Sequence, residues 1–149
     1  MDLSVEYNSR DNYCMDGKKL IPINGENGDV GTEYRTQIES YIKILSIGGS
    51  KGNPDRFKVW MPSGEIYEYG LQEKHIEKIS GVNNTWMLSK ISNRYDNPVL
   101  FNYDIFDDNQ PRIKSITYAK GLNKILFKYS DRKDVTYERS KVKYSLKRG

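Results

Sequence analysis

Residue types that mark several common protein classes are almost missing from this sequence. Its 149 residues include one cysteine, Cys14, one histidine, His75, and one alanine, Ala119. A single cysteine excludes an internal disulfide framework and a cysteine-rich zinc site. No apolar run approaches the ~18 residues of a membrane-spanning helix. We therefore expect no membrane span.

Hydrophobic residues are also few, at 36%, whereas charged residues make up 30%. Globular domains usually contain about 45–50% apolar residues. Twelve Tyr, four Phe and two Trp soften this deficit, because each aromatic ring buries a large apolar area. Tyrosine is favoured in strands and alanine in helices. The composition thus predicts an all-β chain that forms one domain, or a fragment of one, over residues 1–149.

Short strands separated by turn residues are expected along the whole chain. Three hairpins have the clearest signals, at residues 16–17, 62–64 and 94–98. Glycine supplies the positive φ that tight hairpin turns need, so Gly17 and Gly64 are predicted to be structural turn residues. Consecutive hairpins pair their strands antiparallel, and no long helical crossover is present. The prediction is a twisted antiparallel sheet of about nine or ten strands with at most one short helix.

Three segments fit this pattern less well. Residues 72–80 have helical spacing only through Ile76 and Ile79, which predicts a loop with at most one helical turn. The glycine-rich residues 48–54 are expected to be the most flexible loop. Residues after 131 have the least supported fold.

Charge is distributed unevenly. Residues 112–149 contain twelve Lys and Arg against three Asp and Glu, whereas residues 1–111 contain twelve against seventeen. A basic stretch with interleaved aromatics fits nucleic-acid binding, but lysines also cover the outer face of strands and discourage edge pairing. Between residues 141 and 147 lysines alternate with Val142, Tyr144 and Leu146, the pattern of a strand with one basic face. We therefore expect no nucleic-acid partner.

Few side chains could support catalysis or bind a metal. His75 is interpreted as a surface histidine in a loop, and Cys14 as a small buried residue in a hairpin arm. Asp104 with residues 107–109 resembles a calcium loop, but the glycine and closing glutamate of an EF-hand are missing. Residues 48–52 lack the flanking geometry of a phosphate-binding loop. We predict no catalytic, cofactor-binding or metal-binding residue and no cofactor.

The two tryptophans, Trp60 and Trp86, are the candidate ligand-binding residues. Tryptophans in sheets usually anchor packing, and that is the first expectation. If exposed, the two rings would form a platform for a sugar. The alternative to a purely structural function is therefore a carbohydrate- or protein-binding β module that uses exposed Trp and Tyr.

Four motifs occur in a specific order along the chain. They are YCMDGKKL at residues 13–20, GTEYRT at 31–36, FKVW with SGEIYEYG at 57–70, and TWMLSKISNR at 85–94. In this order they resemble the SpvB-type N-terminal region of insecticidal Tc-toxin B subunits and of related Rhs/YD-repeat bacterial proteins. The resemblance covers residues 13–129. Where such proteins have a D-x-x-GN turn, this chain lacks the glycine and has Pro98, which fixes the turn differently.

The resemblance implies a non-catalytic structural segment of a large exported bacterial protein, of toxin type or at the cell surface. Its strands would help to build a β-shell that carries a C-terminal payload. The partners would be other segments of the same polypeptide and, as an alternative, a cell-surface glycan or protein. SpvB-type ADP-ribosyl transfer uses a Glu-x-Glu motif in a C-terminal domain, and this sequence contains none. Residues 1–6 lack the plan of a signal peptide, and we interpret Met1 as added for expression.

Overall fold

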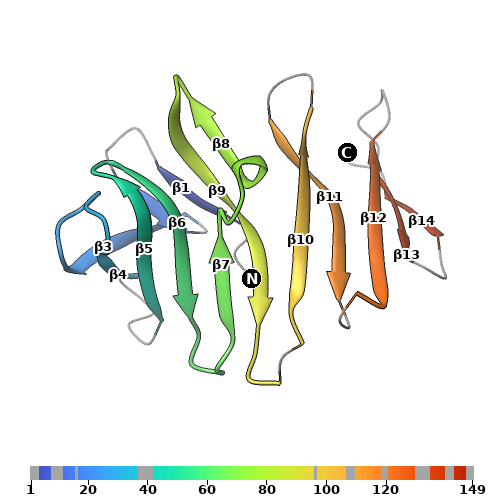
Figure 1. The fold of residues 1–149 in the computed structure, drawn as a ribbon, viewed down its shortest axis with the longest axis horizontal. Coiled ribbons are helices and arrows are strands. Elements are labelled where there is room, and N and C mark those ends of the chain that lie inside the picture. The colour runs from blue at the N-terminus through green and yellow to red at the C-terminus, as the bar shows by residue number, and fades with distance from the viewer. Residues whose placement is uncertain are drawn as a thin grey trace.

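Antiparallel strands make up nearly all of the chain in the computed structural model (Figure 1). The structure describes residues 4–7, 12–15, 17–36, 42–95, 97–106, 110–118 and 121–129, together with the backbone of 135–139 and 143–146. One short 3-10 helix, η1 (Glu73–His75), interrupts the strands. The strands are β1 (Ser4–Tyr7), β2 (Tyr13–Met15), β3 (Lys18–Asn24), β4 (Glu33–Thr36), β5 (Lys43–Ser50), β6 (Asn53–Trp60), β7 (Ile66–Tyr69), β8 (Ile76–Ile79), β9 (Val82–Ser92), β10 (Val99–Ile105), β11 (Pro111–Tyr118), β12 (Asn123–Tyr129), β13 (Val135–Arg139) and β14 (Lys143–Leu146).

The predicted all-β fold is confirmed, and its topology has two parts. Strands β1 to β7 pair in chain order, β7 pairs with β9, and β1 pairs with β9 as well as with β2. These pairings close the first part of the sheet into a ring. From β9 the sheet continues through β10 to β14, again in chain order, as the side-by-side strands in Figure 1 show. No helix in the described residues is long and apolar enough to cross a membrane.

The core lies inside the ring and is largely aromatic. Tyr13 on β2, Phe57 on β6 and Trp86 on β9 are almost completely buried and in mutual contact. The ring centroid of Trp86 is 5.0 Å from that of Phe57 and 5.7 Å from that of Tyr13. The indole N–H of Trp86 donates a hydrogen bond to the Pro54 carbonyl at 3.1 Å. Large rings that each meet several neighbours thus compensate for the low apolar content of the chain.

Residues 72–80, predicted to be a loop with at most one helical turn, contain that turn as η1, but Ile76–Ile79 form the strand β8 instead of a loop. Strand β8 pairs with β9, with Ile79 opposite Val82. Only Ser80 and Gly81 lie between the two strands, with φ of 52° and 78°. Two consecutive positive φ angles are what a tight hairpin turn requires. The charged residues of β8 hid this strand, because they break the apolar alternation that marks a strand in sequence.

Residues 48–54, predicted to be the most flexible loop, are mostly the ends of β5 and β6. Gly49 lies opposite Pro54 and Ser50 opposite Asn53, so the turn itself contains only two residues. A Cβ atom on Gly49 would overlap the Asn53 carbonyl oxygen. The glycine therefore allows two backbones to approach closely within a paired hairpin.

Gly17 and Gly64 lie in hairpin turns and adopt φ of 72° and 92°. Met15 is paired with Lys18, so two residues separate β2 from β3; Asp16 lies outside the described residues. At the β6–β7 turn, the Gly64 N–H donates to the Met61 carbonyl at 3.0 Å. The third hairpin joins β9 to β10.

Replacing Gly17 or Gly64 with valine should lower the free energy of unfolding by about 1 kcal/mol or more, because a β-branched residue strains the left-handed region. No Cβ contact lies within 4 Å at either glycine, so backbone strain alone is tested. Urea denaturation of each variant measures the change. Unchanged midpoints in both variants would contradict the turn assignment.

The Tyr13 hydroxyl is buried inside the ring of strands and has no hydrogen-bond partner among the described residues. Burial raises the pKa of Tyr13 to about 12. Tyr34, by contrast, accepts a hydrogen bond from the Gly28 N–H at 3.0 Å. An unsatisfied buried polar atom is destabilising, so Tyr13→Phe should stabilise the chain by about 1 kcal/mol, whereas Tyr34→Phe should destabilise it by a similar amount. Thermal unfolding of both variants provides the measurement, and equal effects would argue against this difference.

Candidate functional site

The two tryptophans occupy different environments. Trp86 is completely buried among the strands that form the ring, which confirms the first expectation, that a sheet tryptophan anchors packing. The alternative, an exposed ligand platform, does not apply to Trp86, because β9 directs this side chain into the core. Trp60, at the end of β6, is half-buried. The ammonium groups of Lys43 and Lys58 each lie 5.1 Å from its ring centroid. These contacts place cations, rather than open space, beside the Trp60 ring.

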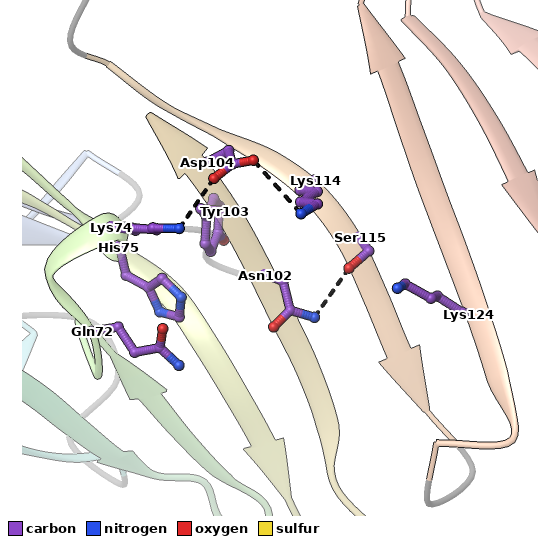
Figure 2. A pocket seen from close by; sticks show the side chains of 9 residues that line it. All are labelled: Gln72, Lys74, His75, Asn102, Tyr103, Asp104, Lys114, Ser115 and Lys124. Atoms are coloured by element: carbon purple, nitrogen blue, oxygen red, sulfur yellow. Dashed lines mark hydrogen bonds and ion pairs between the residues drawn. The ribbon is translucent and has the colours of Figure 1, made fainter. Parts of the chain in front are cut away.

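A polar groove lies between η1 and the strands β10, β11 and β12 (Figure 2). We call it the lysine groove, and its volume is about 310 Å³. It is lined by Gln72, Lys74, His75, Asn102, Tyr103, Asp104, Lys114, Ser115 and Lys124.

One carboxylate organises the upper rim of the lysine groove. Oδ1 of Asp104 is 3.3 Å from Nζ of Lys74, and Oδ2 is 3.7 Å from Nζ of Lys114. Asp104 on β10 thus connects η1 to β11, and Figure 2 shows both lysines directed at it. All three side chains are substantially exposed, so the ion pairs contribute little to stability and chiefly fix where the charges lie.

The floor of the lysine groove consists of amide and hydroxyl groups. The side-chain amide N–H of Asn102 donates to Oγ of Ser115 at 3.1 Å. Ser115 is 2% exposed, whereas Lys124 on the neighbouring strand β12 is exposed. In Figure 2 the Lys124 side chain extends toward Ser115. Polar groups from three adjacent strands therefore converge on one point.

His75 closes the inner side of the lysine groove, and its expected surface position was wrong. The side chain is 3% exposed, and Nδ1 lies 2.5 Å from Oγ of Ser89. Ser89 Oγ also accepts a hydrogen bond from the Leu71 N–H at 3.0 Å. The imidazole packs edge-on against the Tyr103 ring at 4.9 Å. Burial lowers the pKa of His75 to about 4, so the ring is neutral at pH 7.

Tyr103 connects the groove to the ring of strands. Its hydroxyl donates to the Leu88 carbonyl at 2.6 Å, where β10 has already diverged from β9. Only Val99 and Leu100 of β10 are paired with β9. Burial raises the pKa of Tyr103, which keeps the hydroxyl protonated and able to donate.

The groove offers anion-binding chemistry rather than an exposed nucleophile. Its lining contains three ammonium groups, one carboxylate and a neutral imidazole. His75 and Ser89 form a hydrogen-bonded pair, but both are 3% exposed, so a substrate in the groove would not reach the serine hydroxyl. Among the described residues, no group of three or more His, Cys, Asp or Glu could hold a metal ion.

Two other sequence predictions have mixed outcomes. Cys14 lies on β2, a hairpin arm as predicted, but its side chain is half-buried. Of the calcium-like segment, Asp104 belongs to the groove, whereas residues 107–109 lie outside the described residues. Residues 141 and 142 and the side chains of β14 are likewise outside them, so the alternation of lysines with apolar residues there stays a prediction.

Sequence reasoning missed the lysine groove altogether. Lys74, Lys114 and Lys124 are as much as fifty positions apart, and no local motif joins them. The groove also depends on η1, a single turn whose position relative to β10 and β11 no local pattern gives. The available signal was the clustering of Lys114 and Lys124 in the basic C-terminal stretch, which sequence alone could not place next to Lys74.

The strand order places this chain in the class of large antiparallel sheets that are built from consecutive hairpins. No family model and no curated protein matches the sequence. Solved structures do share the fold. The TcdB2-TccC3 crystal structure matches at a TM-score of 0.68 and 14% identity, over 87% of this chain and 9% of that chain. The Tc holotoxin pore of Photorhabdus luminescens matches at 0.67 and 14%, over 88% and 9%.

A third solved structure is the N-terminal domain of the effector protein SpvB from Salmonella typhimurium strain LT2. It matches at a TM-score of 0.66 and 13% identity, over 88% of this chain and 61% of that chain. At such identities the likeness shows a shared fold, and it confirms the fold that the four sequence motifs predicted. The chain spans about a tenth of the Tc-toxin chains and less than two-thirds of the SpvB domain.

The buried, neutral His75 predicts a specific pH dependence of stability. Its folded pKa of about 4 lies below the ordinary 6.5, so the unfolded state binds a proton first as the pH falls. The stabilisation is complete above pH 6.5 and is lost as the pH falls from 6.5 to 4. Between pH 7 and 4.5 the wild-type chain should lose about 2 kcal/mol more stability than His75→Gln.

Urea denaturation at the two pH values measures this difference. Carboxylates titrate in both chains, so their contribution cancels when the variant is compared with the wild type. An identical loss in the two proteins would show that His75 is not held neutral by its surroundings.

Proposed function

We propose that this chain is a non-catalytic structural segment of a much longer exported bacterial protein of toxin type. In this proposal its strands form part of a β-shell that carries a C-terminal payload, and its main partners are other segments of the same polypeptide. The observation that carries the proposal is the extent of the fold likeness. It covers 87% of this chain but only 9% of the TcdB2-TccC3 chain.

The open end of the sheet supports contacts with further strands. Among the described strands, β14 pairs with β13 alone. An edge strand presents unpaired N–H and C=O groups, which favour the addition of another strand. A sheet that continues beyond β14 would satisfy these groups, as the shell requires.

One face of the sheet beyond the ring supports the same conclusion. Phe101 on β10 lies opposite Ile116 on β11, which lies opposite Ile125 on β12. Phe101 is buried, but Ile116 and Ile125 are only half-buried. A row of apolar side chains that is only partly covered fits a surface that meets a partner.

The absence of catalysis is part of the proposal and rests on access. Ser89, which is hydrogen-bonded to His75, is buried and does not line the groove. The alternative, a carbohydrate platform made by two exposed tryptophans, is not supported, because Trp86 is in the core. A secreted or cell-surface location follows from the proposed class and is proposed with it.

Hydrogen–deuterium exchange of this chain and of the longer polypeptide from its reading frame tests the proposal. The backbone amides of β14 should exchange about tenfold more slowly in the longer protein, because a neighbouring strand protects an edge. Amides at the centre of the β5–β6 pair serve as the control and should not change. Equal exchange at β14 would contradict the proposal, as would a reading frame that ends with this chain.

A further inference from the structure

We propose that the lysine groove binds a small anionic ligand, namely a monosaccharide-sized molecule that bears a sulfate or phosphate monoester. This inference concerns a site on the chain itself and is independent of the shell proposal.

The charge balance of the groove favours an anion. Lys74 and Lys114 share the single carboxylate of Asp104, one on each oxygen. Lys124 forms no ion pair with any described residue. Three ammonium groups against one carboxylate leave an excess of two positive charges, since His75 is neutral. Hydrogen bonds between an ammonium group and a charged oxygen are among the stronger ones in proteins.

The floor of the groove favours a ligand with hydroxyl groups. Asn102, which is half-buried, donates to the buried Ser115 hydroxyl, and its carbonyl oxygen makes no hydrogen bond with a described residue and can accept one. Gln72 adds a second side-chain amide at the opposite wall, as Figure 2 shows. Amides and hydroxyls that both donate and accept are suited to sugar hydroxyls.

The size of the groove limits the ligand. Its volume of about 310 Å³ is at the lower end of small-molecule sites, which measure about 300–1,000 Å³. A nucleic acid would instead contact basic residues spread along a stripe, whereas these lysines converge on one hollow. Lys124, whose side chain extends toward Ser115 (Figure 2), would supply an ammonium group to a monoester bound in the groove.

Titration of the chain with galactose 6-sulfate and glucose 6-phosphate, followed by amide NMR, tests this site. Shifts should appear at Asn102, Ser115 and Lys124 with the monoesters and be absent with galactose. Lys124→Ser should weaken binding about tenfold, because it removes a charge-assisted hydrogen bond. Lys128→Ser is the matched control, since Lys128 lies on the same strand and face but outside the groove. It should change the affinity less than about twofold.

Four outcomes would overturn the proposal. The first is the absence of shifts with both monoesters at about 10 mM, a concentration that detects even weak binding. The second is unchanged affinity in Lys124→Ser. The third is an equal loss in Lys124→Ser and Lys128→Ser, which would indicate general charge attraction. The fourth is equal affinity for inorganic sulfate and galactose 6-sulfate, which would mean that the amide floor does not contact the sugar.

Discussion

The pairing of β1 with β9 is the contact on which the rest of the structure depends. Val5 lies opposite Trp86 in this pairing, and both residues are completely buried. An open sheet of these strands would need a second layer to cover its apolar face. A chain with 36% hydrophobic residues has too few of them to build such a layer. Closing the strands into a ring directs that face inward, so that a few aromatic residues form one shared core.

The local features of the fold could be predicted from the sequence, and the long-range ones could not. The turns at Gly17 and Gly64 could be predicted, because the ability to adopt a positive φ is a property of the single residue glycine. The closure of the ring joins residues about eighty positions apart, and no local pattern encodes such a contact. The strand count was too low because several strands have only three or four residues, and such short segments form because their neighbours pair with them.

The candidate site was less predictable still, and His75 shows why. Its neutral state requires Tyr103 from one strand and Ser89 from another to surround the ring. The sequence around each of these residues contains no motif that marks it. The buried surroundings of His75 form only when β9 and β10 diverge and leave space for its side chain. The reverse holds for Trp86, because residue type alone predicts that a sheet tryptophan anchors packing, and this side chain is completely buried.

The seam between β9 and β10 has a mechanical consequence. Two residue pairs of the ladder join β9 to β10, and side chains supply further contacts across the seam. The Tyr103 hydroxyl donates to the Leu88 carbonyl, and Lys74 forms an ion pair with Asp104. Because the ladder is short there, the seam should resist bending less than the longer ladders on either side of it. The lysine groove has η1 on one side of this seam and β10 to β12 on the other. Any change in the angle between the two parts of the sheet would therefore change the width of the groove.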